Sequence, residues 1–448
     1  MKNIVFKRKL YAQMLLWKEE KKGETALLIK GARRVGKSTI AEEFAKNEYE
    51  SYILIDFAIA SKEVNGLFED MMNLDLFFLR LQQIYAVTLK ERRSVIVFDE
   101  VQLQPLARQA IKYLVKDGRY DYIETGSLLS IKKNVKDIVI PSEETRMTLY
   151  PLDYEEFLLA MGDGTTMGLI RQNYEKLMPF GDAVHRKLMR DFRLYMLIGG
   201  MPQAVSTYLD KNNLLEVDIV KREILDLYED DFRKIDPTGR ASRLFSAIPS
   251  QLTSNASRYT IQSVLDKGRL GQVETVIADM EDSMTVSLAY HANDPSAGMN
   301  LHKDIHRYKM FIADTGLFVT LAFKDKDFTE NVIYNKLLSD KMPADLGYVY
   351  ENVVAQMLRS LGYELYYYTF PTESGKHNYE VDFLISKGVK ICPIEVKSSG
   401  YKSHASIDAF TKKFANRVQN RYLVYTKDLR KEDGLVCLPV YLVPTMGK

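Results

Sequence analysis

The stretch of sequence that decides the fold reads Gly31-Ala32-Arg33-Arg34-Val35-Gly36-Lys37-Ser38. An apolar run precedes it at residues 26–29, and a helix-like segment follows at residues 39–47. A strand, a glycine loop and a helix in this order are typical of a phosphate-binding P-loop. A glycine-rich turn that matches by chance is the alternative, and the flanking strand and helix argue against it.

The residue types in this loop suit phosphate chemistry. Gly31 and Gly36 let the backbone turn its N–H groups inward to phosphate oxygens, where side chains would clash. Lys37 would neutralise charge on the β- and γ-phosphates of ATP, and the Ser38 hydroxyl would ligate Mg²⁺. The whole loop, together with Thr39, is therefore predicted to bind the nucleotide.

Length and composition limit the class of protein. A chain of 448 residues is expected to form two to four domains, and 46% hydrophobic with 27% charged residues fits a globular protein. The formal net charge of +2 says little about partners. The two cysteines, Cys392 and Cys437, lack the spacing of a zinc site or a disulfide framework. Without a signal-peptide core or a membrane-length apolar run, we expect a cytoplasmic protein with no membrane partner.

Four further apolar runs, at residues 52–55, 95–98, 120–123 and 147–150, alternate with helical stretches. This alternation predicts an α/β fold with a parallel sheet covered on both faces. The run at residues 95–98 ends in Asp99-Glu100, which resembles the Walker B signature of AAA-type ATPases. Asp99 would hold Mg²⁺, and Glu100 would position or deprotonate the attacking water. The acidic pair favours hydrolysis over mere nucleotide binding.

The next strand ends in Glu124-Thr125-Gly126-Ser127. In the AAA arrangement this strand lies between the P-loop strand and the Walker B strand, so Thr125 or Ser127 would sense the γ-phosphate. Ser127 is equally consistent with a helix N-cap. Arg146, at the start of the last strand, is either an arginine finger or one half of a surface ion pair.

Further along, Gly200-Met201-Pro202 resembles the turn in lids of signal-transducing AAA-related ATPases, where the proline packs on the adenine. A proline at a helix start is also ordinary architecture, so both readings of Pro202 stay open.

These motifs recur together in one family. The stretches that carry the resemblance are GARRVGKS, VIVFDE, ETGS, Tyr150-Pro151-Leu152, residues 155–157, GGMP, Asp314-Thr315-Gly316-Leu317 and Glu380-Val381-Asp382-Phe383. The chain thus resembles uncharacterised prokaryotic AAA-family ATPases, related to signal-transducing ATPases, with a C-terminal domain of unknown function. The resemblance covers most of the chain and implies a P-loop fold and ATP binding, but little about biological role.

The middle of the chain, from about residue 240 to 292, reads as short helices followed by a strand, which suggests a winged helix-turn-helix. A DNA-facing patch is one expectation, and its basic residues would be Arg240, Arg243, Arg258, Lys267 and Arg269. Acidic residues on the expected recognition helix, Asp279, Glu281 and Asp282, would repel phosphate. A packing or spacer role is therefore as well supported as DNA binding.

Near the C-terminus, residues 383–392 read as a β-hairpin with a turn at Ser386-Lys387-Gly388. Alternation along the second strand places Glu395 and Lys397 on one face. Asp382, Glu395 and Lys397 resemble the core of PD-(D/E)xK nucleases, although Val381 replaces the usual proline. Glu351, on an expected helix at residues 348–361, matches the acidic residue that often completes such sites.

In that family the carboxylates of Glu351, Asp382 and Glu395 would hold Mg²⁺, and Lys397 would orient the attacking water. Alternatively, Glu395 and Lys397 form a structural ion pair in a fold that no longer cuts.

Four domains are expected: an AAA-type ATPase core (1–160), a helical lid (161–235), a winged-helix-like domain (236–330) and a nuclease-like domain (331–448). The leading functional hypothesis is an ATPase whose nuclease-like domain acts on or binds nucleic acid. The alternative is a regulatory ATPase whose inactive nuclease-like domain binds DNA or protein. A small-molecule kinase fits the long C-terminal half and the Asp99-Glu100 pair poorly. A homo-oligomer is compatible with all of these readings.

Overall fold

The computed structural model describes residues 4–126, 141–253, 257–265, 270–324, 338 and 347–447. The chain divides into two compact units, the first comprising residues 1–150 with 282–284 and the second comprising the remainder. Ser127, Lys267 and Arg269, which carry sequence predictions, lie outside the described residues. Within the described part, no helix is long and apolar enough to span a bilayer.

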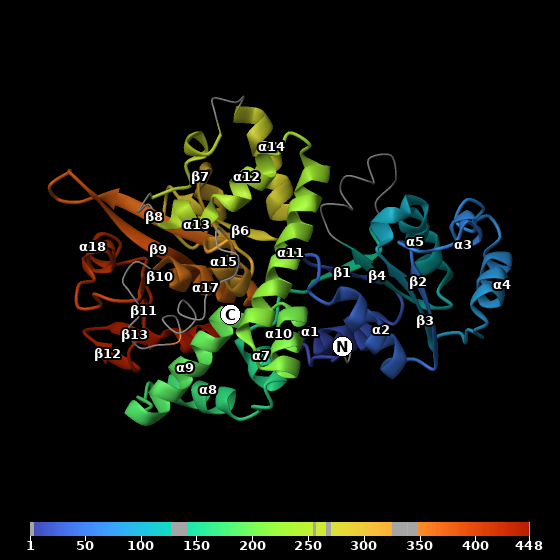
Figure 1. The fold of residues 1–448 in the computed structure, drawn as a ribbon, viewed down its shortest axis with the longest axis horizontal. Helices are drawn as coiled ribbons and strands as arrows, with labels where there is room; N and C mark the ends of the chain where they lie inside the picture. Colours follow the sequence, from blue (N-terminus) through green and yellow to red (C-terminus); the bar gives the residue numbers. More distant parts are fainter. Residues whose placement is uncertain are drawn as a thin grey trace. The chain divides into compact units, whose positions relative to one another are not determined.

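The first unit contains a parallel sheet in the order β2-β3-β4-β1-β5 (Figure 1). Its strands are β1 (Ala26–Lys30), β2 (Ser51–Asp56), β3 (Ser94–Asp99), β4 (Asp121–Gly126) and β5 (Glu144–Thr148). Its helices are α1 (Lys9–Lys21), α2 (Lys37–Glu48), α3 (Lys62–Gly66), α4 (Leu74–Tyr85), the 3-10 turn η1 (Val101–Leu103) and α5 (Pro105–Asp117). The predicted α/β class and parallel sheet are confirmed, and β4 lies between β1 and β3 as expected.

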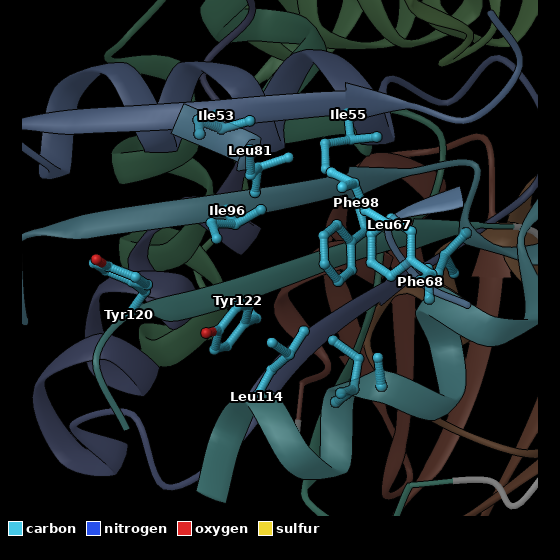
Figure 2. Packing of buried hydrophobic residues seen from close by; sticks show 14 of the residues in the cluster. Ile53, Ile55, Leu67, Phe68, Leu81, Ile96, Phe98, Leu114, Tyr120 and Tyr122 are labelled. Carbon is cyan, nitrogen blue, oxygen red and sulfur yellow. The ribbon is translucent and has the colours of Figure 1, made fainter. Parts of the chain in front are cut away.

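The core on one face of this sheet is built from alternate strand residues (Figure 2). Ile53 and Ile55 of β2 and Ile96 and Phe98 of β3 pack in one cluster with Leu81 of α4. The residues between them on each strand point to the opposite face, because side chains alternate along a strand. Both faces are buried in β3, which explains why its sequence reads as a continuous apolar run.

The second unit begins with a helical region. Its helices are α7 (Tyr154–Ala160), α8 (Thr166–Lys176), α9 (Asp182–Ile198), α10 (Pro202–Lys211), α11 (Leu214–Ile235), α12 (Arg240–Ser246), α13 (Ile248–Thr253), the turn η2 (Ile261–Ser263) and α14 (Leu270–Asp282). A capping box opens α7, in which the Asp153 carboxylate accepts the Glu156 N–H at 2.9 Å and the Glu156 carboxylate accepts the Asp153 N–H at 3.2 Å.

The rest of this unit is a mixed sheet in the order β12-β13-β11-β10-β9-β8-β6-β7 with flanking helices (Figure 1). Its strands are β6 (Val286–Ala292), β7 (Lys303–Ile312), β8 (Leu365–Pro371), β9 (Asn378–Lys387), β10 (Lys390–Lys397), β11 (Arg421–Tyr425), β12 (Arg430–Glu432) and β13 (Leu435–Pro439). The remaining elements are η3 (Met299–His302), α15 (Thr315–Ala322), α17 (Gly347–Ser360), α18 (Ala405–Lys413) and η5 (Val440–Thr445).

The β9–β10 hairpin agrees with the sequence reading. Lys387 pairs with Lys390 across the turn, and Gly388 has a φ of 58°, in the left-handed region that glycine tolerates. The antiparallel register then carries Phe383 opposite Ile394.

The predicted winged helix-turn-helix is not supported. The strand expected as its wing is β6, which pairs antiparallel with β7 and parallel with β8 inside the mixed sheet. Arg240 of the expected basic patch forms an ion pair with Asp236 at 3.3 Å. The predicted boundary between residues 330 and 331 also separates strands that the structure joins in one sheet.

Candidate functional site

The predicted P-loop connects β1 to α2 through a tight turn. A Cβ on Gly31 would lie 2.3 Å from the Leu149 carbonyl oxygen, so only glycine fits at this position. Arg34 and Gly36 adopt left-handed φ values of 69° and 96°, which reverse the chain before α2 begins. The loop is thus folded into a compact turn at the start of a helix, the position in which backbone N–H groups bind phosphate.

Lys37 is buried at the start of α2. Its Nζ donates hydrogen bonds to the Gly31 carbonyl at 3.2 Å and the Ala32 carbonyl at 3.0 Å. The ammonium group is therefore held over the loop, where the β- and γ-phosphates of a bound nucleotide would lie.

The magnesium ligands predicted beside the loop lie together. Ser38 Oγ donates to Asp99 Oδ1 at 2.7 Å, and the Thr125 hydroxyl donates to the same oxygen. Asp99 and Thr125 end neighbouring parallel strands, so their side chains meet at the carboxyl edge of the sheet. A serine hydroxyl and a carboxylate are the oxygen ligands that Mg²⁺ prefers, so these residues fit the metal.

Glu100 follows Asp99 with a left-handed φ of 53°. Its backbone N–H donates to Thr125 Oγ1 at 3.3 Å, and its carboxylate accepts a hydrogen bond from the Gln102 amide. The backbone turn directs Glu100 away from the strand, and Gln102 fixes the orientation of its carboxylate.

Arg8 supports the loop from a distant part of the sequence. It precedes α1, and its guanidinium donates to the Val35 carbonyl at 2.9 Å and the Tyr150 carbonyl at 2.5 Å. The side chain therefore ties the P-loop to the end of the first unit.

Arg146 lies in β5 opposite Leu28, in the middle of an edge strand. Its Nε pairs with Glu144 at 3.0 Å, and its side chain is 51% exposed. Glu144 also pairs with the buried Arg108, which in turn pairs with Glu124 of β4. The geometry within one chain is that of an ion pair, and the arginine-finger role stays a prediction.

Pro202 is the first residue of α10 in the second unit. The turn before it is tightly packed, since a Cβ on Gly200 would lie 2.1 Å from the Leu152 carbonyl oxygen and one on Gly199 would lie 2.2 Å from Asp314 Oδ1. Asp314 accepts the Gly200 N–H at 2.6 Å and caps α15 by accepting the Leu317 N–H at 2.9 Å.

Three of the motifs quoted from the sequence therefore meet in one place, namely Tyr150-Pro151-Leu152, Gly199-Gly200-Met201-Pro202 and Asp314-Thr315-Gly316. We call this the glycine junction, defined by Leu152, Gly199, Gly200, Asp314 and Gly316. Packing accounts for its glycines, and the proposed contact of Pro202 with adenine stays a prediction.

The predicted nuclease-like residues also lie together, in the second unit. Lys397 Nζ pairs with Glu395 Oε1 at 3.0 Å, and Asp382 Oδ2 accepts the Val396 N–H at 2.7 Å. This contact agrees with the prediction that Glu395 and Lys397 lie on the same face of their strand. Burial raises the pKa of Asp382 well above its usual range, and the negative charge of Glu351 adds to the effect.

One residue of this cluster had no signal in the sequence. Lys309 of β7 is 6% exposed, and its Nζ lies 2.5 Å from Glu380, 3.4 Å from Glu351 and 4.0 Å from Asp382. Burial alone would lower the pKa of Lys309, but these three carboxylates outweigh it and raise the pKa. A cation supplied by the chain itself therefore lies where the sequence predicted a metal.

The predicted metal role of Glu351, Asp382 and Glu395 stays a prediction. Among the described residues, no three His, Cys, Asp or Glu side chains are placed to hold a metal ion. Lys309 lies 3.4 Å from Glu351 and 4.0 Å from Asp382, two of the three predicted ligands, so its positive charge competes with a divalent cation for them.

Comparison with known families finds a match that covers most of the first unit. Residues 23–158 match a family described as an AAA domain. This part of the chain is thus similar to AAA domains, and we call it the AAA domain. Residues 189–327 and 346–443 of the chain match two domains of unknown function, DUF8612 and DUF4143. Comparison with curated proteins gives no match.

Similar solved structures are distant. PCH-2 of C. elegans is 12% identical with a TM-score of 0.20 and covers 37% of this chain and 44% of its own. A signal transduction ATPase with numerous domains from Pyrococcus horikoshii, with a tetratricopeptide repeat sensor, is 12% identical with a TM-score of 0.27, covering 80% of this chain and 46% of its own. The chain thus spans less than half the length of each.

Sequence reasoning missed Arg8, Gln102 and Lys309. Arg8 and Lys309 reach partners 27 or more residues away in sequence, so no local pattern marks them. Gln102 sits two residues after the acidic pair of the AAA domain, and a polar residue there is the only signal available.

Proposed function

We propose that the AAA domain binds Mg-ATP and hydrolyses it. The observation that carries the proposal is the meeting of Ser38 and Thr125 at one oxygen of Asp99, beside the P-loop lysine. A P-loop alone indicates phosphate binding, whereas an acidic strand end beside it supplies a place for the metal and a base.

Each residue has a role in this proposal. Lys37 would exchange its bonds to Gly31 and Ala32 for the β- and γ-phosphates, while Ser38 and Asp99 would hold Mg²⁺. When bound, Mg²⁺ neutralises phosphate charge that would otherwise oppose attack by water. Glu100 would take the proton of the attacking water after its carboxylate turns from Gln102, and Thr125 would contact the γ-phosphate.

Two substitutions test the proposal. Lys37→Ala should abolish tight ATP binding, measured by nucleotide titration, because the phosphates lose their buried cation. Glu100→Gln should keep ATP binding and lower turnover roughly 100- to 10,000-fold, since the base is removed while the phosphate contacts remain.

Lys46→Ala is the matched control for Lys37→Ala. Lys46 lies on the same helix and forms an exposed ion pair with Glu42 at 2.8 Å, so binding and turnover should be unchanged. Unaltered ATP binding by Lys37→Ala would show that the loop is not the nucleotide site.

For the second unit we propose that its nuclease-like part binds nucleic acid or protein without cutting, under the control of the ATPase. Lys309 is the observation that favours this reading over cleavage, since it already contacts Glu351, Glu380 and Asp382. Glu351 and Asp382 are two of the three carboxylates that would hold the metal of a nuclease here.

A DNA assay separates the two readings. Wild-type protein with plasmid or linear DNA, ATP, and Mg²⁺ or Mn²⁺ should leave the DNA intact. Cleavage that Asp382→Ala and Lys397→Ala both abolish would establish a nuclease and overturn the regulatory reading. DNA retention in a gel-shift assay would then distinguish nucleic acid from a protein partner.

A further inference from the structure

The cluster around Lys309 draws its charges from separate elements. Lys309 comes from β7, Glu351 from α17, and Glu380 and Asp382 from β9. Lys309 is 6% exposed, whereas Glu351 and Glu380 are 24% and 28% exposed. Lys309 is thus less exposed than each of the three carboxylates near its ammonium group, namely Glu351, Glu380 and Asp382.

The oxygens that remain are also bound by the protein. Asp382 Oδ2 accepts the Val396 N–H at 2.7 Å. Glu395 uses one oxygen for Lys397 at 3.0 Å and the other for the Ile407 N–H at 3.3 Å. Both oxygens of Asp382 and of Glu395 therefore face donors of the chain.

An ammonium group and a divalent metal place different demands on such a cluster. A lysine ammonium donates about three hydrogen bonds. Lys309 Nζ lies at hydrogen-bond distance from Glu380 (2.5 Å) and Glu351 (3.4 Å), and at ion-pair distance from Asp382 (4.0 Å). Mg²⁺ requires about six oxygens in near-octahedral geometry at close range. The arrangement around Lys309 suits an ammonium group better than it suits Mg²⁺.

We propose that Lys309 is the permanent cation of this site and takes the place of a divalent metal. The ammonium group of β7 forms ion pairs with α17 and β9, so the carboxylates of this cluster stabilise the packing of these three elements. The role of Lys309 deepens the proposal that the second unit does not cut, and its functional meaning rests on that proposal. Metal binding itself can be measured without DNA or ATP.

A consequence follows for variants without the lysine. Neutralising Lys309 leaves Glu351, Glu380 and Asp382 without their buried partner, which is strongly destabilising. The same carboxylates then become available to a cation from solution. Loss of stability and gain of metal binding should therefore appear in the same variant.

The experiment uses the full chain without nucleotide, titrated with MnCl₂, and reads both the melting temperature and free Mn²⁺ by electron paramagnetic resonance. Wild type and Asp382→Asn should bind Mn²⁺ equally, with melting temperatures that do not depend on the metal. Lys309→Met should melt roughly 10 °C lower without metal. With Mn²⁺ it should regain part of that loss and bind at least about tenfold more tightly than wild type, a difference of about 1.4 kcal/mol.

The control is Lys324→Met. Lys324 is 35% exposed and pairs with Glu229 at 2.6 Å, so its loss should change neither stability in Mn²⁺ nor Mn²⁺ binding. In Lys309→Met, a further Asp382→Asn change should remove the gained binding.

Mn²⁺ binding by wild type that Asp382→Asn abolishes would overturn the proposal, even if every Lys309 variant failed to fold. A stable Lys309→Met that gains no Mn²⁺ binding would overturn it as well. Failure of the ATPase tests would leave these readouts unaffected, and DNA cleavage by wild type would contradict the regulatory reading separately.

Discussion

At the scale of residues, the AAA domain holds an ionic triad behind its nucleotide site. Arg108 of α5 pairs with Glu124 of β4 and Glu144 of β5, and all three side chains are at most 1% exposed. Glu124 directly precedes Thr125, whose hydroxyl contacts Asp99. Two buried carboxylates share one arginine here, so protonation of one of them is energetically favourable.

Glu124 is that carboxylate. Burial raises its pKa to about 8, Arg108 opposes the shift, and the charge of Glu144 reinforces it. Because the folded-state pKa lies above the unfolded value, the native state holds its proton more tightly. The stability that Glu124 contributes is therefore complete at low pH and is lost as pH rises towards about 8.

Glu124→Gln should consequently become more stable than wild type as pH rises, since glutamine resembles the protonated acid at every pH. The measurement is the melting temperature of both proteins between pH 5 and pH 9. The difference should grow up to about pH 8 and then level off. Glu42→Gln, at an exposed site of α2, is the control. A difference that stays constant over this range would contradict the assignment.

At the scale of elements, the glycine junction fixes how α9, α10 and α15 meet. Gly316 approaches α9 closely, since its Cβ would lie 2.5 Å from the Ile198 carbonyl oxygen. Leu152 N–H donates to the Gly200 carbonyl at 2.7 Å, so backbone groups rather than side chains make the contact. Main-chain atoms cannot move aside for a methyl group without shifting a helix.

Gly200→Ala should therefore destabilise the second unit by about 2–3 kcal/mol, the cost of overpacking against fixed atoms. The measurement is thermal or urea unfolding of the full chain. Gly168→Ala is the control and should change stability in the opposite direction. Gly168 lies in α8, and no atom lies within 4 Å of the position that its Cβ would take. Alanine there should stabilise by about 0.5–1 kcal/mol. Equal effects of the two changes would contradict the packing argument.

Elements were predictable where the signal is local. The β9–β10 hairpin follows from a glycine turn between apolar strands, and the place of β4 follows from the motif order of AAA domains. The glycine junction joins residues more than 100 positions apart, such as Gly200 and Asp314. Its motifs were visible in the sequence, but their mutual contact was not, because only the folded chain brings them together.

The residues of the candidate sites were likewise predictable where the signal is local, and not where it depends on distant parts of the sequence. Lys37, Ser38, Asp99 and Thr125 lie at a loop or strand end, and their meeting was predictable from strand order. The burial of Lys309 was not predictable, since β7 is charged along its first half and its sequence does not mark where burial begins. The partners of Lys309 follow 42 or more residues later in the sequence.

At the scale of the whole molecule, the open question for the AAA domain is whether one chain completes its own site. An arginine finger from a second copy would place Arg146 at the neighbour's γ-phosphate. Within the chain, the half-exposed Arg146 pairs at 3.0 Å with Glu144, whose side chain is buried and also pairs with Arg108. Glu144 would keep its pair with Arg108 if Arg146 turned away, so the pair favours the ion-pair role but the test is turnover.

The rate of ATP hydrolysis by Arg146 variants distinguishes the two roles of Arg146. If Arg146 serves only the pair with Glu144, Arg146→Ala should hydrolyse ATP at about the wild-type rate, because Glu144 keeps its pair with Arg108. Mixing Arg146→Ala with Lys37→Ala should then give no more than the sum of the separate rates. If Arg146 acts across subunits, Arg146→Ala should instead lose turnover about 1,000-fold or more. The mixture should then recover activity, since one interface keeps both Lys37 and Arg146 intact. The ion-pair geometry of the single chain favours the first outcome, and recovery in the mixture would replace it with a shared site in an oligomer.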